Sequence, residues 1–343
     1  MDRDDTTPPP SGPWPSPDWP LEEPAGSSGL DDLGAPAPIT PVLPPLSPPR
    51  GRRHTVLFVL TVLTTSYWGF IQYQAYYLDD LVTLNPLSEP MLWLAGLPYG
   101  LAVISFLLAH EMGHYLACRY YGIAATLPYF IPIPPVPGLV LLPGTMGAVI
   151  RIVAPIKSRR ALFDVAIAGP LAGFLAAIPI LAVGLAQSRV VDLQDLGAGT
   201  ISMGEPLIWA PLSIIFAPPM GPQQTLLAHP LAFVGWFALL VTAMNLLPVG
   251  QLDGGHLLYA ITPRLHRGIS LLMVLAMVFA GFRYFSGWLV FAFLVLFVLG
   301  TRHPRPLTFE GSLGLTRLLL LVLAIVVFAT SFTLVPVTID LNF

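Results

Sequence analysis

The sequence predicts an all-α polytopic membrane protein with about seven transmembrane helices, a re-entrant proline-rich loop and a short β-hairpin near the helix that carries two histidines. Composition is the first reason. Of the 343 residues, 55% are hydrophobic and 10% are charged, whereas soluble domains contain about 25% charged residues. The second reason is that apolar segments long enough to cross a hydrocarbon core of about 30 Å alternate with short polar breaks from residue 54 onward.

The chain divides near residue 53. Residues 1–53 are rich in Pro, Ser, Gly and Asp and show no apolar period, so they cannot bury enough surface to offset the entropy of ordering. We interpret them as a disordered, Pro-rich cytoplasmic tail, and residues 54–343 as a membrane-embedded domain. The tail begins with MDRDD, which has neither the basic start and apolar core of a secretory signal nor the acid-poor composition of a transit peptide.

The apolar segments predict seven spans, which are placed by their length and by the polar residues between them. The predicted span at 287–300 is the shortest, and only the sequence RYFSG separates it from the span before it. The seven predicted spans are 54–77, 91–118, 161–187, 229–249, 268–284, 287–300 and 315–337.

Basic residues set the expected orientation, because the cytoplasmic loops of membrane proteins carry an excess of Lys and Arg. Arg50, Arg52 and Arg53 precede the first span, whereas Asp79 and Asp80 follow it, which places the N-terminus in the cytoplasm. The same rule places the C-terminus on the outside. We expect the membrane to be a bacterial cytoplasmic membrane. The later inside turns contain Arg119, Arg151, Lys157, Arg159, Arg160, Arg264, Arg267, Arg302 and Arg305, and the outside breaks contain Arg189 and Arg283.

The segment LLAHEMGHYLACRYYG, residues 107–122, places ionisable side chains inside an apolar span. His110 and His114 are four residues apart, so on a helix they project from one face, with Glu111 beside them. Imidazole nitrogens suit zinc, and the carboxylate can act as general base for an attacking water and pass the proton to a leaving amine. An ionisable residue within a span costs about 2.5–3.5 kcal/mol on insertion scales, which favours a functional role over a polar packing cluster.

A catalytic zinc needs a third protein ligand and one open position for water. Asp253, in the sequence NLLPVGQLDGGH, follows the 229–249 span on the same predicted side as His110 and His114. We therefore expect it to be the third ligand. Taken alone, Asp253 could instead be a helix N-cap or a turn residue.

Three sequences, HEMGH, AIAGPLAG (166–173) and NLLPVGQLDGG (245–255), occur in this order in successive spans. Together they resemble the site-2 protease family of intramembrane zinc metalloproteases, over residues 90–310 with a catalytic core at about 91–256. The sequences KSRRALFDVAIAGPLAGF and RHPRP are similar to the branch without a PDZ domain, which includes cyanobacterial and plant chloroplast EGY-type members. The outside break at 188–228 has about 40 residues, near the lower limit for an independently stable domain, so no PDZ module fits there.

The resemblance implies a reaction and a site. It implies that His110, His114 and Asp253 bind Zn2+ and that Glu111 is the catalytic base of a zinc metalloendopeptidase. Asn245, which could otherwise be only an interhelical hydrogen-bond partner, matches the asparagine that assists substrate positioning or the oxyanion. Family members cut a membrane-anchored protein within or beside its transmembrane helix. The expected partners are therefore a single-span membrane protein substrate, an upstream site-1-type protease and the lipid bilayer.

Three further segments bear on how a substrate is held. Residues 127–144 are apolar but too proline-rich for a helix, so we interpret them as a re-entrant loop that lines the water path, with a surface connector as the alternative. Residues 144–152, GTMGAVIRI, predict an edge strand that pairs with an unwound substrate, with an ordinary hairpin strand covered at both edges as the alternative. Residues 206–218 are too short to span and are expected to be interfacial.

Other functions remain open on these residues alone. A polytopic metal-ion transporter or an inactive membrane scaffold would also contain such side chains, but the candidate ligands gather at one depth, and a scaffold leaves Glu111 unexplained. A Ste24-like prenyl protease would use a glutamate as third ligand, and no glutamate follows in a comparable span. The net charge of -3 is small, so no nucleic-acid partner is expected. We expect Cys118, the single cysteine, to be a packing residue and His256 to be structural or to support the ligands.

Overall fold

The computed structural model describes residues 51–77, 90–133, 143–195, 201–301, 303–304, 306–308 and 311–339. The predicted tail lies outside the described residues except for its last three positions, which are helical. Residues 134–142, the proline-rich centre of the predicted re-entrant loop, also lie outside them. The disordered tail and the re-entrant path therefore stay predictions.

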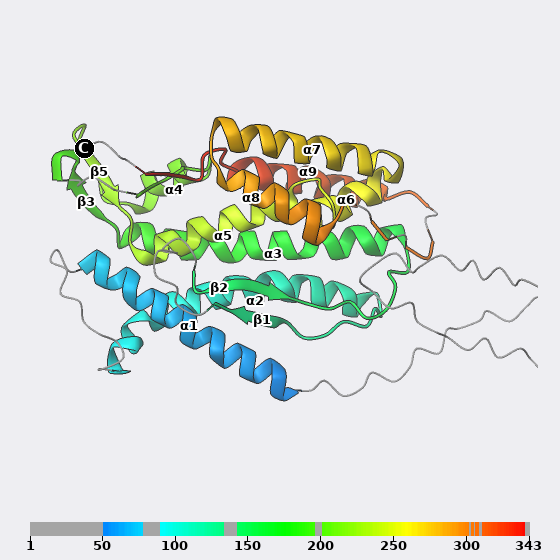
Figure 1. Cartoon of the computed structure of the whole chain (residues 1–343), viewed down its shortest axis with the longest axis horizontal. Helices are drawn as coiled ribbons and strands as arrows, with labels where there is room; N and C mark the ends of the chain where they lie inside the picture. The colour runs from blue at the N-terminus through cyan, green and yellow to red at the C-terminus, as the bar shows by residue number, and fades with distance from the viewer. Residues whose placement is uncertain are drawn as a thin grey trace, which may run out of the picture. The chain divides into compact units, whose positions relative to one another are not determined.

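Every predicted apolar segment contains a helix, and these helices run alternately between the two ends of a bundle (Figure 1). The helices are α1 (Gly51–Tyr77), α2 (Leu97–Tyr120), α3 (Arg159–Ala186), α4 (Trp209–Phe216), α5 (Pro230–Leu246), α6 (Asp253–Ile261), α7 (Pro263–Arg283), α8 (Gly287–Leu294) and α9 (Gly314–Ser331). Shorter helical turns are η1 (Pro90–Gly96), η2 (Leu193–Asp195) and the π-helical η3 (Val295–Leu299). Ser158 caps α3 by accepting a hydrogen bond from the N–H of Ala161, which is a common way to begin a helix.

Five helices within the described residues are long and apolar enough to cross a membrane. They are Gly51–Tyr77, Trp93–Tyr120, Arg159–Ala186, Pro263–Arg283 and Gly314–Ser331. The other two predicted spans correspond to shorter apolar helices, Pro230–Leu246 and Gly287–Val298. At about 1.5 Å per residue, the 17 residues of α5 reach about 26 Å, which is less than a hydrocarbon core of about 30 Å. By length the structure supports about five spans, and the prediction of seven is not confirmed.

Local backbone restrictions explain why these two helices are short. Leu247 precedes Pro248, and a proline ring disfavours helical backbone in the residue before it. Leu247 accordingly has a ψ of 132°, and α5 ends at Leu246. At the other short helix, α8 continues into η3, which ends at Gly300 with a φ of 73°. That conformation favours glycine, so the apolar segment cannot continue as a helix.

Contacts between distant segments define one end of the bundle at the start of α3. Arg159 donates hydrogen bonds to the carbonyls of Ala260 and Ile261 at the end of α6. The N–H of Thr308, in the segment before α9, donates to the carbonyl of Lys157. We call this the basic end, because it contains the described basic residues Arg119, Arg151, Lys157, Arg159, Arg160, Arg264 and Arg267.

The opposite end carries two small antiparallel sheets that the sequence did not predict, and we call it the sheet end. Here β3 (Arg189–Asp192) pairs with β5 (Gln224–Leu227), and β4 (Ile201–Met203) pairs with β6 (Val337–Ile339). The hydroxyl of Tyr76, at the end of α1, donates to the carbonyl of Gln187, which follows α3. Arg189 and Arg283 both lie at this end. The separation of the two arginine groups therefore matches the sidedness that the sequence predicts.

The predicted β-hairpin is present. β1 (Tyr129–Pro132) pairs in antiparallel fashion with β2 (Thr145–Val149), and the register shifts between Phe130 and Pro132. The hairpin lies along α2 (Figure 1). Within the described residues, β1 and β2 form a two-stranded sheet, so the second edge of β2 is not covered by another described strand.

Helices α2, α3 and α5 form the centre of the bundle, where Phe106, Leu181 and Leu239 are fully buried. Gly113 on α2 makes a close approach to α3, because a Cβ at this position would collide with the carbonyl of Ala168. The two helices therefore pack with backbone against backbone, which only glycine allows. Cys118 is fully buried, which confirms its predicted packing role.

Helix α4 occupies the predicted interfacial segment. It has eight residues, too few to span a membrane, and Ile214 and Ile215 are 83% and 69% exposed. An apolar surface of this kind at one end of the bundle agrees with a position at the membrane interface. That position stays a prediction.

Single-cysteine labelling tests the sidedness. Cys118 is the only cysteine in the sequence and is buried, so Cys118→Ser provides a cysteine-free background. In that background we expect Arg267→Cys, at the basic end, and Gln223→Cys, at the sheet end, to react with a membrane-impermeant maleimide from opposite faces of the membrane. Both positions are exposed. Labelling of both from the same face would contradict the alternating arrangement.

Candidate metal centre

The site begins on one side of α2, where His110 and Glu111 are adjacent and His114 lies one turn later. The helix is uninterrupted from Leu97 to Tyr120, so the spacing of four residues places both imidazoles on the same side. The three side chains are buried, with 5%, 9% and 8% of their surfaces exposed. Three polar groups this deep in an apolar bundle require partners, because an unpaired buried polar group is costly.

The second part of the site comes from the loop between α5 and α6. α5 ends at Leu246, the chain turns at Gly250 with a φ of 56°, and α6 begins at Asp253. A Cβ on Gly254 would collide with the carbonyl of Leu246, so the start of α6 folds back closely onto the end of α5. The residue at the N-cap of α6 is Leu252, and no side chain caps this helix. The alternative reading of Asp253 as an N-cap is therefore wrong.

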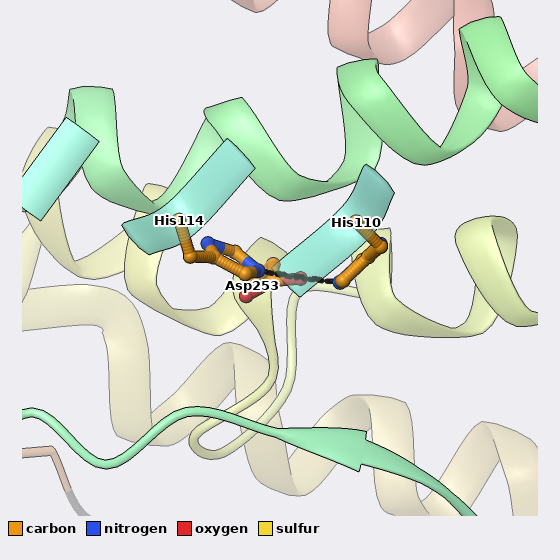
Figure 2. A group of neighbouring side chains, drawn as sticks. All are labelled: His110, His114 and Asp253. Carbon is orange, nitrogen blue, oxygen red and sulfur yellow. Dashed lines mark hydrogen bonds and ion pairs between the residues drawn. The ribbon is translucent and has the colours of Figure 1, made fainter. Parts of the chain in front are cut away.

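Asp253 instead faces the two histidines (Figure 2). Its Oδ2 lies 3.4 Å from Nε2 of His110 and 3.4 Å from Nε2 of His114. The two Nε2 atoms lie 3.2 Å apart. Among the described residues, these three form the group of His, Cys, Asp and Glu side chains that could hold a metal ion.

The three distances fit zinc. Zinc binds imidazole nitrogen and carboxylate oxygen at about 2.0–2.1 Å in tetrahedral geometry, so its donor atoms lie about 3.3–3.4 Å from one another. The donor atoms of His110, His114 and Asp253 are separated by 3.2, 3.4 and 3.4 Å. Three protein donors leave a fourth tetrahedral position for water or substrate, which is the arrangement of catalytic rather than structural zinc.

A backbone carbonyl on α3 orients His114. Nδ1 of His114 lies 2.7 Å from the carbonyl oxygen of Val165. A carbonyl only accepts hydrogen bonds, so Nδ1 carries the proton and Nε2 presents its lone pair to the donor cluster. Gly169 makes room for the ring, because a Cβ there would overlap the imidazole. The first glycine of the AIAGPLAG sequence, Gly169, is thus explained by the space that His114 needs.

Glu111 is fixed by the segment that follows β2. Its Oε2 accepts a hydrogen bond of 2.9 Å from the N–H of Ile150. The carboxylate borders a cavity of about 320 Å³, which is also lined by the three donor residues, by Ala148 and Val149 and by apolar residues of α3. A carboxylate at this position can take a proton from a water in the cavity.

Asn245 and His256 also line this cavity. The side-chain nitrogen of Asn245 lies 3.4 Å from Nε2 of His110, so the amide is beside the donor cluster. His256 lies 2.5 Å, Nδ1 to Nε2, from His303, and the ring of His303 stacks on Tyr259. Burial lowers the pKa of His256 to about 4 and that of His303 to about 3, so both rings are neutral near pH 7.

The sequence missed two functional groups, the carbonyl of Val165 and the N–H of Ile150. Both belong to the backbone, and the side chains of valine and isoleucine give no sign of them. The predicted edge strand at 144–152 was the only sequence signal that pointed to the N–H of Ile150, because an exposed strand edge offers unpaired backbone groups.

Comparison with known proteins identifies the family. The family model of Peptidase family M50 matches the sequence over residues 99–282. This range is more than half of the 343 residues. The chain belongs to peptidase family M50. This family consists of membrane zinc metalloproteases of the site-2 protease type, so membership favours a protease over the transporter and the scaffold. The matched region contains the H-E-x-x-H sequence and Asp253.

Curated relatives of this M50 member are plant proteins. It is 34% identical over 184 residues to "Probable zinc metalloprotease EGY1, chloroplastic" of Arabidopsis thaliana, an alignment that covers 52% of the chain and 31% of the relative. It is 32% identical over 187 residues to EGY1 of Oryza sativa subsp. japonica, covering 52% and 29%. It is 32% identical over 167 residues to EGY2 of Oryza sativa subsp. indica, covering 48% and 29%. The match thus spans about a third of the length of these relatives.

The comparisons bear on location as well. The long apolar helices confirm a multi-pass integral membrane protein. The relatives are named as chloroplast proteins, so they give no support to the predicted bacterial cytoplasmic membrane.

Substitutions can separate metal binding from chemistry. We expect Glu111→Gln to retain about one zinc per chain and to lose peptide hydrolysis by at least about a hundredfold, because the base is removed and the three donors remain. Asp253→Ala should lose both zinc and hydrolysis. Metal analysis of the purified proteins and cleavage of a quenched fluorescent peptide in detergent measure the two properties. Full, tight zinc binding by Asp253→Ala would remove that residue from the donor set.

Proposed function

We propose that this M50 member is an intramembrane zinc metalloendopeptidase that cleaves membrane-anchored proteins within or next to their transmembrane segment. The observation that carries the proposal is the placement of His110, His114, Asp253 and Glu111 around one cavity among apolar helices. A soluble substrate would not need such a site, since ionisable side chains inside an apolar helix are costly to insert. A substrate that is itself embedded in the bilayer would need its hydrolytic site at this depth.

His110, His114 and Asp253 would hold the metal. When bound, zinc polarises the scissile carbonyl and lowers the pKa of water. Glu111 takes the proton of the attacking water and passes it to the leaving nitrogen, which needs a carboxylate within hydrogen-bond reach of the cavity. The Ile150 N–H holds that carboxylate in place. The amide of Asn245, beside His110, can donate to the oxygen that becomes negatively charged.

The substrate must be unwound, because a transmembrane helix ties its carbonyls into internal hydrogen bonds. The segment after β2 offers a place for the unwound chain. Arg151 faces the segment that leads into β1, since its N–H donates to Oγ1 of Thr126 and its carbonyl accepts from the N–H of Thr126. Ile150 faces the opposite way, toward Glu111. Backbone groups alternate along an extended chain, so Val149 faces β1 and Ala148 faces the cavity.

We infer that an unwound substrate pairs with this cavity-facing edge at Ala148, two residues before Ile150, whose N–H holds the catalytic carboxylate. Strand addition would replace the hydrogen bonds that the substrate helix gives up. It would also place the substrate backbone along the cavity that contains the donor cluster. Val149 is paired with Tyr129 in the hairpin and does not belong to the free edge, so Ala148 is the residue to test.

The remaining features of the function follow from the same proposal. The substrate is a single-span membrane protein, and an upstream site-1-type protease shortens it before it enters the cavity. The basic end and the N-terminus face the cytoplasm or the equivalent compartment, as the distribution of arginine and lysine indicates. Lipid is the solvent for the outer surface of the bundle, where long apolar helices are exposed.

The strand-addition step is testable at Ala148. We expect Ala148→Pro to reduce cleavage at least about tenfold, because proline lacks the N–H that the free edge offers. Zinc content and melting temperature should stay near those of the wild type. Val149→Ile is the matched control at the next position and should cleave normally. Normal cleavage by a folded, zinc-loaded Ala148→Pro enzyme would rule out pairing at this residue.

The protease function itself is tested in membranes. Quantitative proteomics should compare cells that contain the wild-type protein with cells that contain Glu111→Gln. We expect single-span membrane proteins, or their shortened forms, to accumulate in the variant, since it can bind but not cut them. No accumulation under any stress would favour the transporter or the scaffold.

A further inference from the structure

Asp164 and Arg317 are charged residues of apolar helices that are not members of the donor cluster. Asp164 is the only acidic residue of α3, and Arg317 is the only charged residue of α9. A charged group in a membrane helix is costly and is usually retained for a specific interaction. Within α9 the fully buried residues are Ala324, Val327 and Ser331, whereas Leu320 and Leu321, one turn after Arg317, are only partly buried against the core.

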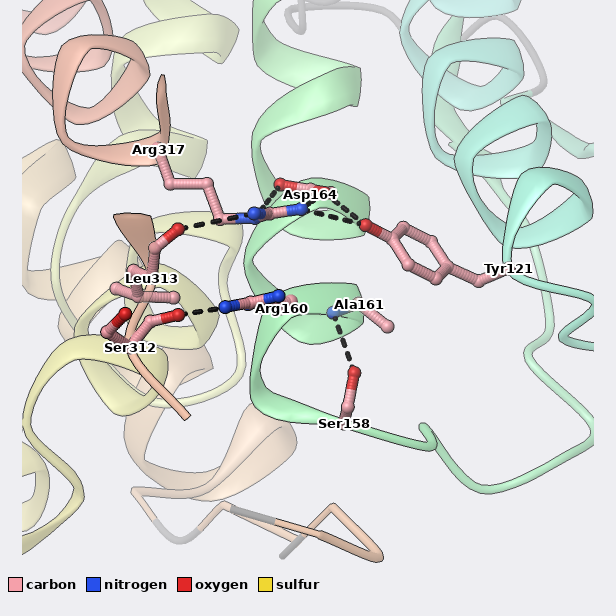
Figure 3. A network of polar contacts seen from close by, with 8 residues as sticks. All are labelled: Tyr121, Ser158, Arg160, Ala161, Asp164, Ser312, Leu313 and Arg317. Atoms are coloured by element: carbon pink, nitrogen blue, oxygen red, sulfur yellow. Dashed lines mark hydrogen bonds and ion pairs between the residues drawn. The ribbon is translucent and has the colours of Figure 1, made fainter. Parts of the chain in front are cut away.

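The two residues form a bidentate ion pair, which Tyr121 completes (Figure 3). Arg317 donates from Nε to Oδ1 of Asp164 at 2.8 Å and from Nη2 to Oδ2 at 2.5 Å. The hydroxyl of Tyr121, the residue after α2, donates to Oδ2 of Asp164 and accepts from Nη2 of Arg317. Bidentate pairs of arginine and carboxylate fix direction as well as distance. The network therefore ties α2, α3 and α9 together at one level.

That level is next to the donor cluster. Asp164 directly precedes Val165, whose carbonyl accepts the Nδ1 proton of His114. Tyr121 lies seven residues, or about two turns, after His114 on the chain that continues α2. Gly169, one turn further along α3, also lies against the imidazole, because a Cβ there would overlap the ring. A displacement of α3 along α2 would therefore move the carbonyl that orients His114.

We propose that Asp164 and Arg317 are positioning residues for the metal centre, and that they act by holding α3 in register with α2 so that the Val165 carbonyl orients His114. The inference rests on the metal site proposed above. It gives α9, a peripheral helix, an effect on the metal site through a single side chain. The alternative is that the network only anchors α9 to the bundle.

The experiment measures metal binding rather than proteolysis. The full chain is purified in detergent as wild type, Arg317→Met, Arg317→Lys and Tyr121→Phe. Zinc affinity is measured by competition with a chelator, ligand geometry by the visible spectrum of the cobalt-substituted protein, and stability by melting temperature. Arg160→Gln is the matched control, because Arg160 is a neighbouring guanidinium that contacts the carbonyl of Ser312 and does not touch Asp164.

We expect Arg317→Met to lose about tenfold in zinc affinity and to change the cobalt spectrum, since partners that orient metal ligands contribute about 10–100-fold to affinity. Arg317→Lys should recover part of the loss because it keeps the charge but not the bidentate geometry. Tyr121→Phe removes the hydrogen bond by which this network joins the end of α2 to Asp164, so it should also lose zinc affinity, and it keeps the test valid if Arg317→Met does not fold. Arg160→Gln should match the wild type in affinity and spectrum.

Unchanged zinc affinity and an unchanged cobalt spectrum in the folded variants, with a lower melting temperature, would overturn the inference and leave only an anchoring role. Absence of zinc binding in the wild type would be a different failure. It would contradict the proposed metal site itself, because the wild type contains the intact network.

Discussion

Where α2 crosses α3, Gly169 lies against the imidazole of His114 and Gly113 lies against the carbonyl of Ala168. The absence of side chains at these two points lets the helices approach until the Val165 carbonyl reaches Nδ1 of His114. Orientation of a metal-binding imidazole by the hydrogen bond of its other nitrogen is a general requirement of such sites. The direction of Nε2, and with it the fit of the donor cluster to zinc, therefore depends on this helix contact.

The third donor is added by interrupting a different helix. α5 stops because Leu247 precedes a proline, and the chain turns back at Gly250 before α6 starts at Asp253. The interruption shortens α5 below the length of an ordinary span, yet it places a carboxylate beside the buried histidines. Buried ionisable groups are tolerated when they meet partners. The proline and glycine after α5 therefore account both for the short helix and for the position of the third donor.

Backbone groups supply the remaining positions at the site. The Ile150 N–H holds the carboxylate of Glu111, and the strand before it presents Ala148 to the same cavity. A hairpin beside a helix can do this because one edge of a two-stranded sheet has no described partner. The cavity thus combines side chains that could hold a metal with the strand edge at which we propose that a peptide pairs, and both line the same cavity.

The sequence by itself determined the membrane class, the apolar segments that became helices, the strand at 144–152 and the two histidines of the donor cluster. These follow from composition, from segment length and from the spacing of His110 and His114, all of which are local properties of the chain. The number of full spans was not determined, because helix ends depend on residues such as Pro248 and on packing as well as on hydropathy. Only the tertiary structure decided that Asp253 faces the histidines and does not cap α6, that Val165 orients His114, and that Asp164 meets Arg317. Each of these contacts joins residues from different helices, and at Val165 the contact atom is a backbone carbonyl that every residue has.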